Sequence, residues 1–134
     1  TVNSSYVHLV KIWGEKMHKI AVTSEGRGNL EDPVASRFGR APKITIVEID
    51  DYGNILKVNV MDNPGAGAES GAAVKTLRAL VDAGVEAVVG PAFGPNAQAI
   101  LDEVIIKGMV VPAGTKIKEA VEIAKKELNI SGRA

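Results

Sequence analysis

The sequence predicts an α/β fold in which a mixed, largely parallel sheet carries helices on its faces. Two observations lead to this prediction. From about residue 70 onward, amphipathic helical repeats alternate with short β-type runs, an order typical of parallel sheets. Upstream of them, residues 19–61 contain three further β-type runs. The last two of these form a hairpin, so one strand of the sheet is antiparallel.

The first half of the chain supplies these three strands and one long loop. Residues 19–23 form a short β-type run, and residues 24–42 are rich in Gly, Pro and charged residues, which is typical of a loop. Residues 43–49 and 55–61 are rich in β-branched residues and are joined by the turn-forming residues 50–54. We therefore expect a hairpin with a five-residue connection.

The second half of the chain supplies three helices. The first has Ser70 as its expected N-cap and Gly84 as its expected end, because these residue types favour those positions. The second opens at Gly94 and Pro95, where the missing N–H of proline costs nothing, and ends at Gly108. We expect Thr115 to cap the third helix. The apolar faces of the three helices consist of Val74, Leu77, Leu80 and Val81; of Ala97, Ile100, Leu101, Val104 and Ile105; and of Ile117, Ala120, Val121, Ala124 and Leu128.

Two short apolar runs, at residues 87–90 and 109–112, lie between these helices and complete the sheet. The expected order of elements is therefore βββαβαβα. A chain of 134 residues has the size of a single domain. We expect that domain to span residues 17–134, preceded by an N-terminal extension over residues 1–16, in which the apolar run at residues 6–13 could add an edge strand.

The composition excludes several functional classes. Sixteen Lys and Arg residues balance sixteen Asp and Glu residues, so no net charge attracts nucleic acid or an anionic membrane. The absence of Cys excludes disulfides, thiolate nucleophiles and thiolate metal ligands. No apolar run approaches the roughly 20 residues of a membrane span and no signal peptide is evident, so we expect a cytoplasmic protein. His18 comes just before the first strand, and we expect it to face solvent.

Four short motifs follow one another along the domain. They are KIAVTS at residues 19–24 with Asp-Pro at 32–33, SRFGRAP at 36–42, NPGAG at 63–67, and VVG at 88–90 with FGPNA at 93–97. In this order and spacing they resemble the dinitrogenase iron–molybdenum cofactor biosynthesis family, also known as the nitrogenase accessory factor-like domain. The resemblance covers residues 19 to about 123.

The resemblance implies a three-layer α/β/α fold of the ribonuclease-H-like type, with a five-stranded mixed sheet in the order 3-2-1-4-5. It also implies an accessory or carrier protein that binds an iron–molybdenum or other metal–sulfur cluster, or a small anion, together with partners in cofactor assembly. Family members that handle the nitrogenase cofactor often carry His at the position of Arg37. An Arg can hold an anionic cluster or an oxyanion by charge and hydrogen bonds, whereas the sequence identifies no metal ligand.

The expected sheet order places the loops after the first and fourth strands in one crevice, because the chain reverses direction between those strands. The two cations of the segment at residues 36–40, Arg37 and Arg40, and the N-terminus of the second helix would attract an anion there. The candidate cofactor-binding residues from the motifs at this edge and from the Gly-rich loop are Thr23, Ser24, Glu25, Arg37, Phe38, Gly39, Arg40, Asn63, Gly65, Gly67, Phe93, Gly94, Pro95 and Asn96. For Phe38, burial as an anchor of the long loop is the favoured interpretation.

Two other functional classes are open to the same residues. The Gly-rich loop at residues 65–71 follows a strand and precedes a helix, so a nucleotide- or phosphate-binding regulatory module is the alternative function. An enzyme is the least favoured class. The first strand carries no carboxylate for a two-metal reaction, and no His follows a candidate nucleophile.

Overall fold

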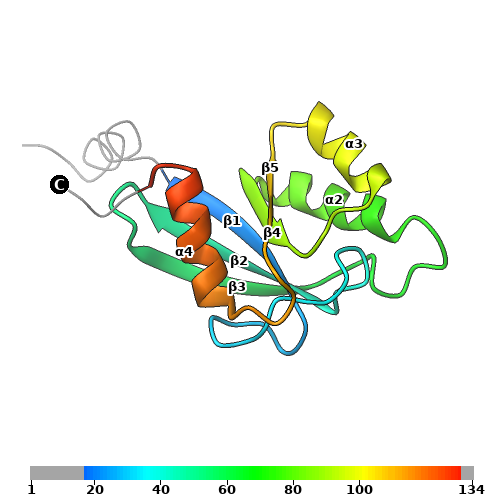
Figure 1. Cartoon of the computed structure of the whole chain (residues 1–134), viewed down its shortest axis with the longest axis horizontal. Coiled ribbons are helices and arrows are strands. Elements are labelled where there is room, and N and C mark those ends of the chain that lie inside the picture. The colour runs from blue at the N-terminus through cyan, green and yellow to red at the C-terminus, as the bar shows by residue number, and fades with distance from the viewer. Residues whose placement is uncertain (1–16, 131–134) are drawn as a thin grey trace, which may run out of the picture.

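The computed structural model describes residues 17–130 of the chain (Figure 1). The predicted extension over residues 1–16 lies outside the described residues, as do residues 131–134. The elements follow the predicted order: β1 (Met17–Ser24), β2 (Lys43–Asp50), β3 (Ile55–Asp62), α2 (Ala72–Ala83), β4 (Ala87–Gly90), α3 (Pro95–Glu103), β5 (Lys107–Val110) and α4 (Ile117–Glu127).

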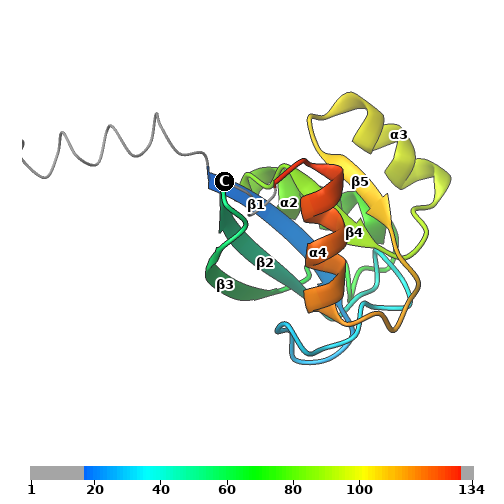
Figure 2. The same ribbon diagram turned by 60° about the vertical axis from the view of Figure 1, so that its left-hand side comes forward.

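The five strands form one mixed sheet in the order β3-β2-β1-β4-β5, which confirms the predicted order. The strand β2 runs antiparallel to both of its neighbours, whereas β1, β4 and β5 are parallel to one another. Figure 2 shows β3 and β5 at the two edges of the sheet. Because β1 and β4 are parallel and adjacent, their carboxyl ends meet at one edge, where the chain reverses direction within the sheet.

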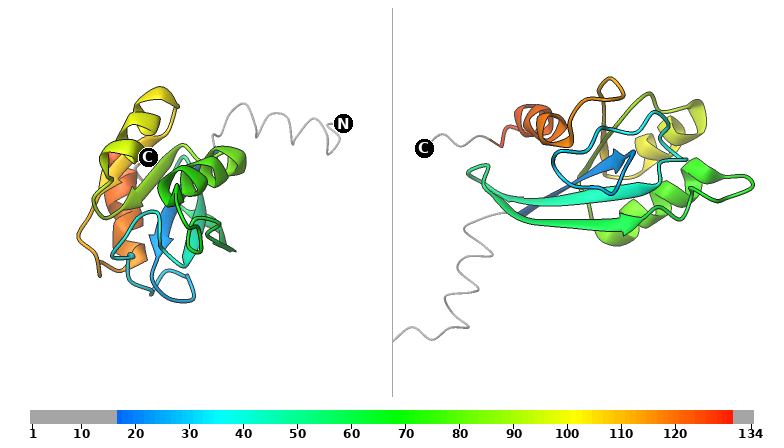
Figure 3. Two further views of the ribbon diagram at one scale, coloured as in Figure 1. Left: turned by 90° about the vertical axis from the view of Figure 1, so that its right-hand side faces the viewer. Right: turned by 90° about the horizontal axis from the view of Figure 1, so that it is seen from below.

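Each face of the sheet has its own core. Alternation along β1 sends Ile20 and Val22 to the face covered by α4, whereas Ala21 packs on the other face with residues of α2 and α3. Figure 3 shows α4 and α2 on opposite sides of the sheet. The buried residues of α4 are Ile117, Ala120, Val121 and Ala124, four of the five residues predicted for its apolar face. The layers are therefore helix, sheet and helix.

The ends of α2 and α3 differ in part from the prediction. Gly84 ends α2 in the left-handed conformation, at a φ of 75°, as expected, but the N-cap is Gly71 at a φ of 69° instead of Ser70. A glycine adopts this backbone without steric cost. Because Val104 is extended, at a φ of −102° and a ψ of 166°, α3 ends at Glu103. Gly108, predicted to end this helix, therefore lies inside β5.

The predictions for the start of α4 and for three apolar side chains were also wrong. The N-cap of α4 is Lys116, and the Thr115 hydroxyl instead donates to the Pro112 carbonyl 2.7 Å away. The side chains predicted to be buried but found exposed are Val74, Val81 and Ile105. None of the helices within residues 17–130 is long and apolar enough to span a membrane.

Candidate functional site

The edge where β1 and β4 end contains a buried hydroxyl without a partner. The side chain of Thr23 is fully buried, and its Oγ1 atom has no hydrogen-bond partner among residues 17–130. Leaving a buried hydroxyl unpaired costs about 1–3 kcal/mol. Such a group in a native protein requires an explanation, and a bound ligand that accepts the hydrogen bond is one such explanation.

Two aromatic rings and a glycine surround this hydroxyl. A Cβ atom at Gly90 would lie 3.1 Å from Thr23 Oγ1, 3.4 Å from Phe38 Cδ1 and 3.8 Å from Phe93 Cε1. The rings of Phe38 and Phe93 pack edge to face, with centroids 5.0 Å apart. Phe93 also lies over Gly108 of β5, since a Cβ there would be 3.1 Å from Phe93 Cε2. Sequence analysis did not single out Gly90 or Gly108 as part of this edge.

The loop after β1 is held against the strand by its backbone. The N–H of Ala35 donates to the Thr23 carbonyl at 2.9 Å, and the N–H of Ser36 donates to Glu25 Oε1 at 3.0 Å. Phe38 is buried in the core on the α2 face, so the interpretation of this residue as an anchor agrees with the structure. The intervening Arg37 is exposed and makes no hydrogen bond or ion pair with any residue in the range 17–130. Its guanidinium is therefore available to a ligand.

The other predicted loop residues join this loop to the Gly-rich loop before α2. Nη1 of Arg40 donates to the Ala68 carbonyl, so part of its hydrogen-bonding capacity is used within the protein. Gly39 passes so close to the first turn of α2 that a Cβ there would lie 2.7 Å from the Ala73 nitrogen. Glycine is required here for close approach of two backbones.

The centre of this connection is the buried carboxamide of Asn63. Its Nδ2 donates to the carbonyls of Gly39 at 3.2 Å and Ala41 at 2.9 Å. Its Oδ1 accepts from the N–H of Gly65 at 3.0 Å and from the Thr76 hydroxyl at 2.9 Å. All four hydrogen-bonding positions of the carboxamide are thus filled by the protein. The part of Thr76, the fifth residue of α2, was not predicted from the sequence.

The loop at residues 65–71 is itself tightly turned. The N–H of Ala66 donates to the Asn63 carbonyl at 3.0 Å, and the N–H of Ala68 donates to the Gly65 carbonyl at 3.1 Å. With Gly65 N–H bound to Asn63, three backbone donors of this loop are used internally. A phosphate cradle needs free backbone donors, and these three donors are not free. Gly67, in the same loop, is exposed with open space around it.

The N-terminus of α3 offers free donors at the same edge as Thr23. Its N-cap Gly94 and the next two residues, Pro95 and Asn96, are all exposed, and the Gly94 carbonyl accepts from Gln98 N–H at 2.9 Å. The first N–H groups of a helix have no partner within it and favour an anion. Since Pro95 has no N–H, the donors of this turn are those of Asn96 and Ala97.

The structure separates Ser24 from the other predicted residues. Its hydroxyl lies 2.7 Å from Thr45 Oγ1, and both side chains are buried. Neighbouring residues of a strand point to opposite faces, so Ser24 faces the α4 side whereas Thr23 faces α2 and α3. The edge thus brings together Thr23, Phe38 and Phe93, with Arg37 on the adjoining loop.

The expectation that His18 faces solvent was wrong. His18 lies within β1 and is only 8% exposed. Its Nδ1 is 2.9 Å from Glu86 Oε1 and its Nε2 is 2.9 Å from Asp51 Oδ1. Both partners lie at the opposite end of β1 from Thr23, and both are distant in sequence. This imidazole therefore joins the β2–β3 turn and the connection before β4 to the start of β1.

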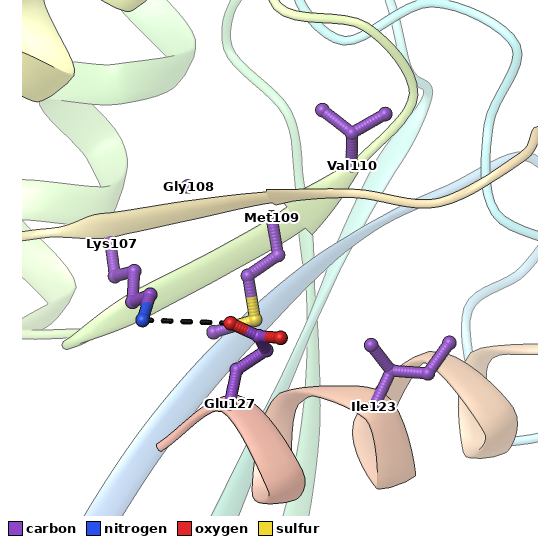
Figure 4. A pocket seen from close by; sticks show the side chains of 6 residues that line it. All are labelled: Lys107, Gly108, Met109, Val110, Ile123 and Glu127. Carbon is purple, nitrogen blue, oxygen red and sulfur yellow. Dashed lines mark ion pairs between the residues drawn. The ribbon is translucent and has the colours of Figure 1, made fainter.

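A shallow pocket of about 280 Å³ lies on the far side of the sheet, between β5 and α4. Figure 4 shows its lining, with an ion pair of 3.6 Å between Lys107 and Glu127 beside Met109 and Ile123. None of the predicted site residues lines it. Within residues 17–130, no three His, Asp or Glu side chains are placed to hold a metal ion.

Several solved structures resemble the chain. The apo form of the orange protein from Desulfovibrio gigas is 27% identical, with a TM-score of 0.68 over 83% of this chain and 89% of that chain. A Thermotoga protein described as a candidate NifB protein is 28% identical, with a TM-score of 0.60 over 81% of this chain and 88% of that chain. PH0822, 18% identical, shares the fold, with a TM-score of 0.67 over 81% of this chain and 90% of that chain.

No curated protein is similar enough in sequence to match the chain. A family model described as dinitrogenase iron-molybdenum cofactor matches residues 18–127, which is nearly the whole of the described domain. All four sequence motifs and all eight described elements fall within or overlap this range. The chain therefore belongs to the dinitrogenase iron–molybdenum cofactor family.

Proposed function

We propose that this protein is a non-enzymatic accessory or carrier protein, which binds an anionic ligand at the edge where β1 and β4 end. The ligand class is a metal–sulfur cluster, of the iron–molybdenum or a related type, or a small oxyanion. The observation that carries the proposal is the buried hydroxyl of Thr23, which has no partner among residues 17–130. Because the hydroxyl is fully buried, a ligand oxygen or sulfur would accept its hydrogen bond once the packing of the neighbouring Phe38 and Phe93 rings opens.

The charges at this edge support an anion. Arg37 is exposed, and the N–H groups of Asn96 and Ala97 lie at the positive end of α3. A guanidinium supplies several donors in one plane and suits the oxygens of an oxyanion. Glu25 brings a negative charge to the same edge, but its Oε1 accepts the Ser36 N–H. Binding therefore depends mainly on Arg37.

The residues present fit a cluster held by charge and hydrogen bonds rather than by coordination. The chain has no Cys, and His18 is hydrogen-bonded to two carboxylates at the far end of β1. The same two facts support a binding role over catalysis, because no imidazole within residues 17–130 lies beside a nucleophile at this edge. Cofactor-assembly proteins are the partners we propose for delivery or release of the ligand.

The test is calorimetric titration of molybdate, of sulfate and, anaerobically, of a synthetic thiomolybdate against four proteins. They are the unmodified chain, Arg37→Ala, Thr23→Val and the control Arg78→Ala, which removes an exposed Arg from α2. Loss of a hydrogen bond to a charged partner costs roughly 1.5–3 kcal/mol, so Arg37→Ala should weaken binding about tenfold or more. Binding should also weaken with added salt, because exposed charges are screened.

Thr23→Val should weaken binding while leaving the fold intact, and Arg78→Ala should bind like the unmodified chain. Equal loss in Arg37→Ala and Arg78→Ala would mean that binding reflects only overall charge. No binding of any of the three anions to the unmodified chain would contradict the proposal, and so would undiminished binding to both Arg37→Ala and Thr23→Val.

A further inference from the structure

The buried hydroxyl of Thr23 is closed off from solvent by its neighbours. The Thr23 side chain has no exposed surface, so an anion cannot reach its Oγ1 atom while this packing is closed. A Cβ atom at Gly90 would lie 3.1 Å from this oxygen, 3.4 Å from Phe38 Cδ1 and 3.8 Å from Phe93 Cε1. The two rings therefore pack beside the hydroxyl, and a ring has to move before a ligand can accept its hydrogen bond.

The loop that carries Phe38 is held in place by the residue that follows. The carbonyl of Gly39 accepts from Asn63 Nδ2 and from the Thr76 hydroxyl, each at 3.2 Å. A Cβ atom at Gly39 would lie 2.7 Å from the Ala73 nitrogen, so this part of the loop lies directly against α2. Phe38 itself is only 4% exposed. A movement of Phe38 would disturb all of these contacts, so its ring belongs to the fixed part of the edge.

The segment that carries Phe93 has fewer restraints. Residues 91–94 connect β4 to α3 and belong to neither. Phe93 is half-buried, between the exposed residues Ala92 and Gly94. Within residues 17–130, the N–H groups of Ala92 and Phe93 donate no hydrogen bond. A Cβ atom at Gly94 would meet nothing within 4 Å, so this glycine has the space and the backbone freedom of a hinge.

The Phe93 ring lies on main chain, over two glycines of neighbouring strands. A Cβ atom at Gly108 of β5 would lie 3.1 Å from Phe93 Cε2, and Gly90 belongs to the adjacent β4. Because neither glycine has a side chain, the ring can leave its position without displacing one there. The edge-to-face contact with Phe38, at a centroid distance of 5.0 Å, stabilises the closed position.

We propose that Phe93 is a gate over the Thr23 hydroxyl, closed in the free protein and opened when an anion binds. This inference rests on the proposed function, because it concerns access to the same site. The closed state leaves a buried hydroxyl unpaired, whereas an anion in the open state accepts its hydrogen bond. The ligand therefore has a higher affinity for the open state, and such a difference in affinity shifts the equilibrium toward opening.

Fluorine NMR of the full chain tests which ring moves. Phe38 and Phe93 are the two Phe residues of the sequence, so labelling with para-fluorophenylalanine gives one resonance for each, assigned with Phe38→Leu and Phe93→Leu. In the free protein, relaxation dispersion should detect microsecond-to-millisecond exchange for Phe93 and none for Phe38. Saturation with a synthetic thiomolybdate should increase the solvent isotope shift of the Phe93 resonance, because the ring becomes exposed.

Two results of this experiment would overturn the gate. One is a larger gain in solvent isotope shift for Phe38 than for Phe93. The other is an unchanged Phe93 resonance in a protein that calorimetry shows to be saturated with the thiomolybdate.

Association kinetics test the gate independently, by stopped-flow mixing with the same thiomolybdate. A minor open state is commonly populated at about 0.1–10%, and the apparent affinity falls by that fraction. Phe93→Ala, which removes the gate, should therefore associate about tenfold faster or more than the unmodified chain. Tyr52→Ala is the matched control, because it removes an exposed aromatic side chain from the β2–β3 turn, and its association rate should be unchanged. Circular dichroism checks that both variants are folded.

The kinetic outcomes separate the gate from the proposed function. Binding to Phe93→Ala and to the unmodified chain at equal association rates would overturn the gate and leave the proposed function intact. Absence of binding to both proteins would contradict the proposed function itself, and the gate with it.

Discussion

The hydroxyl of Thr76 lies 2.9 Å from Oδ1 of Asn63, so a side chain in the first half of α2 is hydrogen-bonded to the residue where the Gly-rich loop begins. Both side chains are buried. Through Asn63, α2 is connected to the carbonyls of Gly39 and Ala41 in the loop after β1. The loop after β1 and the Gly-rich loop, two of the loops that carry predicted site residues, are thus held by one carboxamide.

Replacing Asn63 by Ala should therefore destabilise the protein. The change leaves the Gly65 N–H and the two carbonyls without their partner, and each buried polar group left unpaired costs about 1–3 kcal/mol. The free energy of unfolding in urea should fall by at least this amount. Asn59→Ala is the control, because Asn59 is exposed on β3. A similar small effect for both variants would show that the Asn63 hydrogen bonds contribute little.

A second prediction compares the effect on stability of replacing two glycines of the same loop. A Cβ at Gly65 would lie within 2.5 Å of Thr76 Oγ1 and 2.8 Å of the Gly39 carbonyl, so Gly65→Ala forces the loops apart. Overpacking of this kind costs about 1–3 kcal/mol. A Cβ at Gly67 meets nothing within 4 Å, and Gly67→Ala should be neutral or slightly stabilising. Thermal unfolding of the two variants checks this, and a lower Tm for Gly67→Ala than for Gly65→Ala would contradict it.

A third prediction compares two buried threonines on adjacent strands. Thr23 Oγ1 has no partner among residues 17–130, whereas Thr45 Oγ1 lies 2.7 Å from the Ser24 hydroxyl. In the free protein, Thr23→Val should keep or raise the unfolding free energy, by up to about 1–3 kcal/mol. Thr45→Val should lower it by about 1 kcal/mol. Chemical denaturation distinguishes the two, and equal destabilisation would mean that the Thr23 hydroxyl is satisfied.

A fourth prediction concerns acid. The pKa of Asp50 is lowered, first by the hydrogen bond from the Asn54 N–H and also by those from the Asn54 side chain and the Tyr52 N–H. A carboxyl whose pKa is lower in the folded state stabilises that state above its unfolded pKa. This stability is lost as the pH falls through the folded pKa. The stability of Asp50→Ala should therefore depend less on pH across this acidic range.

The measurement for Asp50 is urea unfolding at neutral pH and at a pH below the ordinary carboxyl value. Asp82→Ala, which removes an exposed carboxylate from α2, is the control for the loss of one negative charge. If Asp50→Ala loses as much stability on acidification as the unmodified chain does, Asp50 does not contribute to it. Direct titration of the Asp50 carboxyl by NMR should give a pKa below the ordinary value of an aspartate side chain.

The order and type of the elements could be predicted because they depend on local patterns. The run of β-branched residues in β2, which is buried on both faces, and the spacing of Ile117, Ala120, Val121 and Ala124 in α4 are such patterns. The helix caps were less predictable. Ser70 has a residue type that favours an N-cap, but the chain turns through Gly71 in a left-handed conformation, so the backbone of a glycine and not a side-chain cap marks the boundary.

The site was predictable only in outline, because its contacts are distant in the sequence. The motifs placed Thr23, Phe38 and Phe93 at one edge, and the structure agrees. No local pattern could show that Asn63 binds Gly39, 24 residues away, or that His18 binds Glu86, 68 residues away. The same limit explains why Thr76 was missed, since its role depends on two loops that meet it in space.

The two glycines beneath Phe93 have a consequence for engineering the edge where β1 and β4 end. Gly90 and Gly108 lie on neighbouring strands, and a Cβ at either would come close to the rings of Phe38 or Phe93 or to the Leu101 side chain. The aromatic rings therefore rest on main chain, whose shape does not vary with side-chain identity. A library intended to change ligand preference should hold these glycines fixed and vary Phe38 and Phe93, because only the aromatic side chains at this edge can be exchanged without moving the main chain.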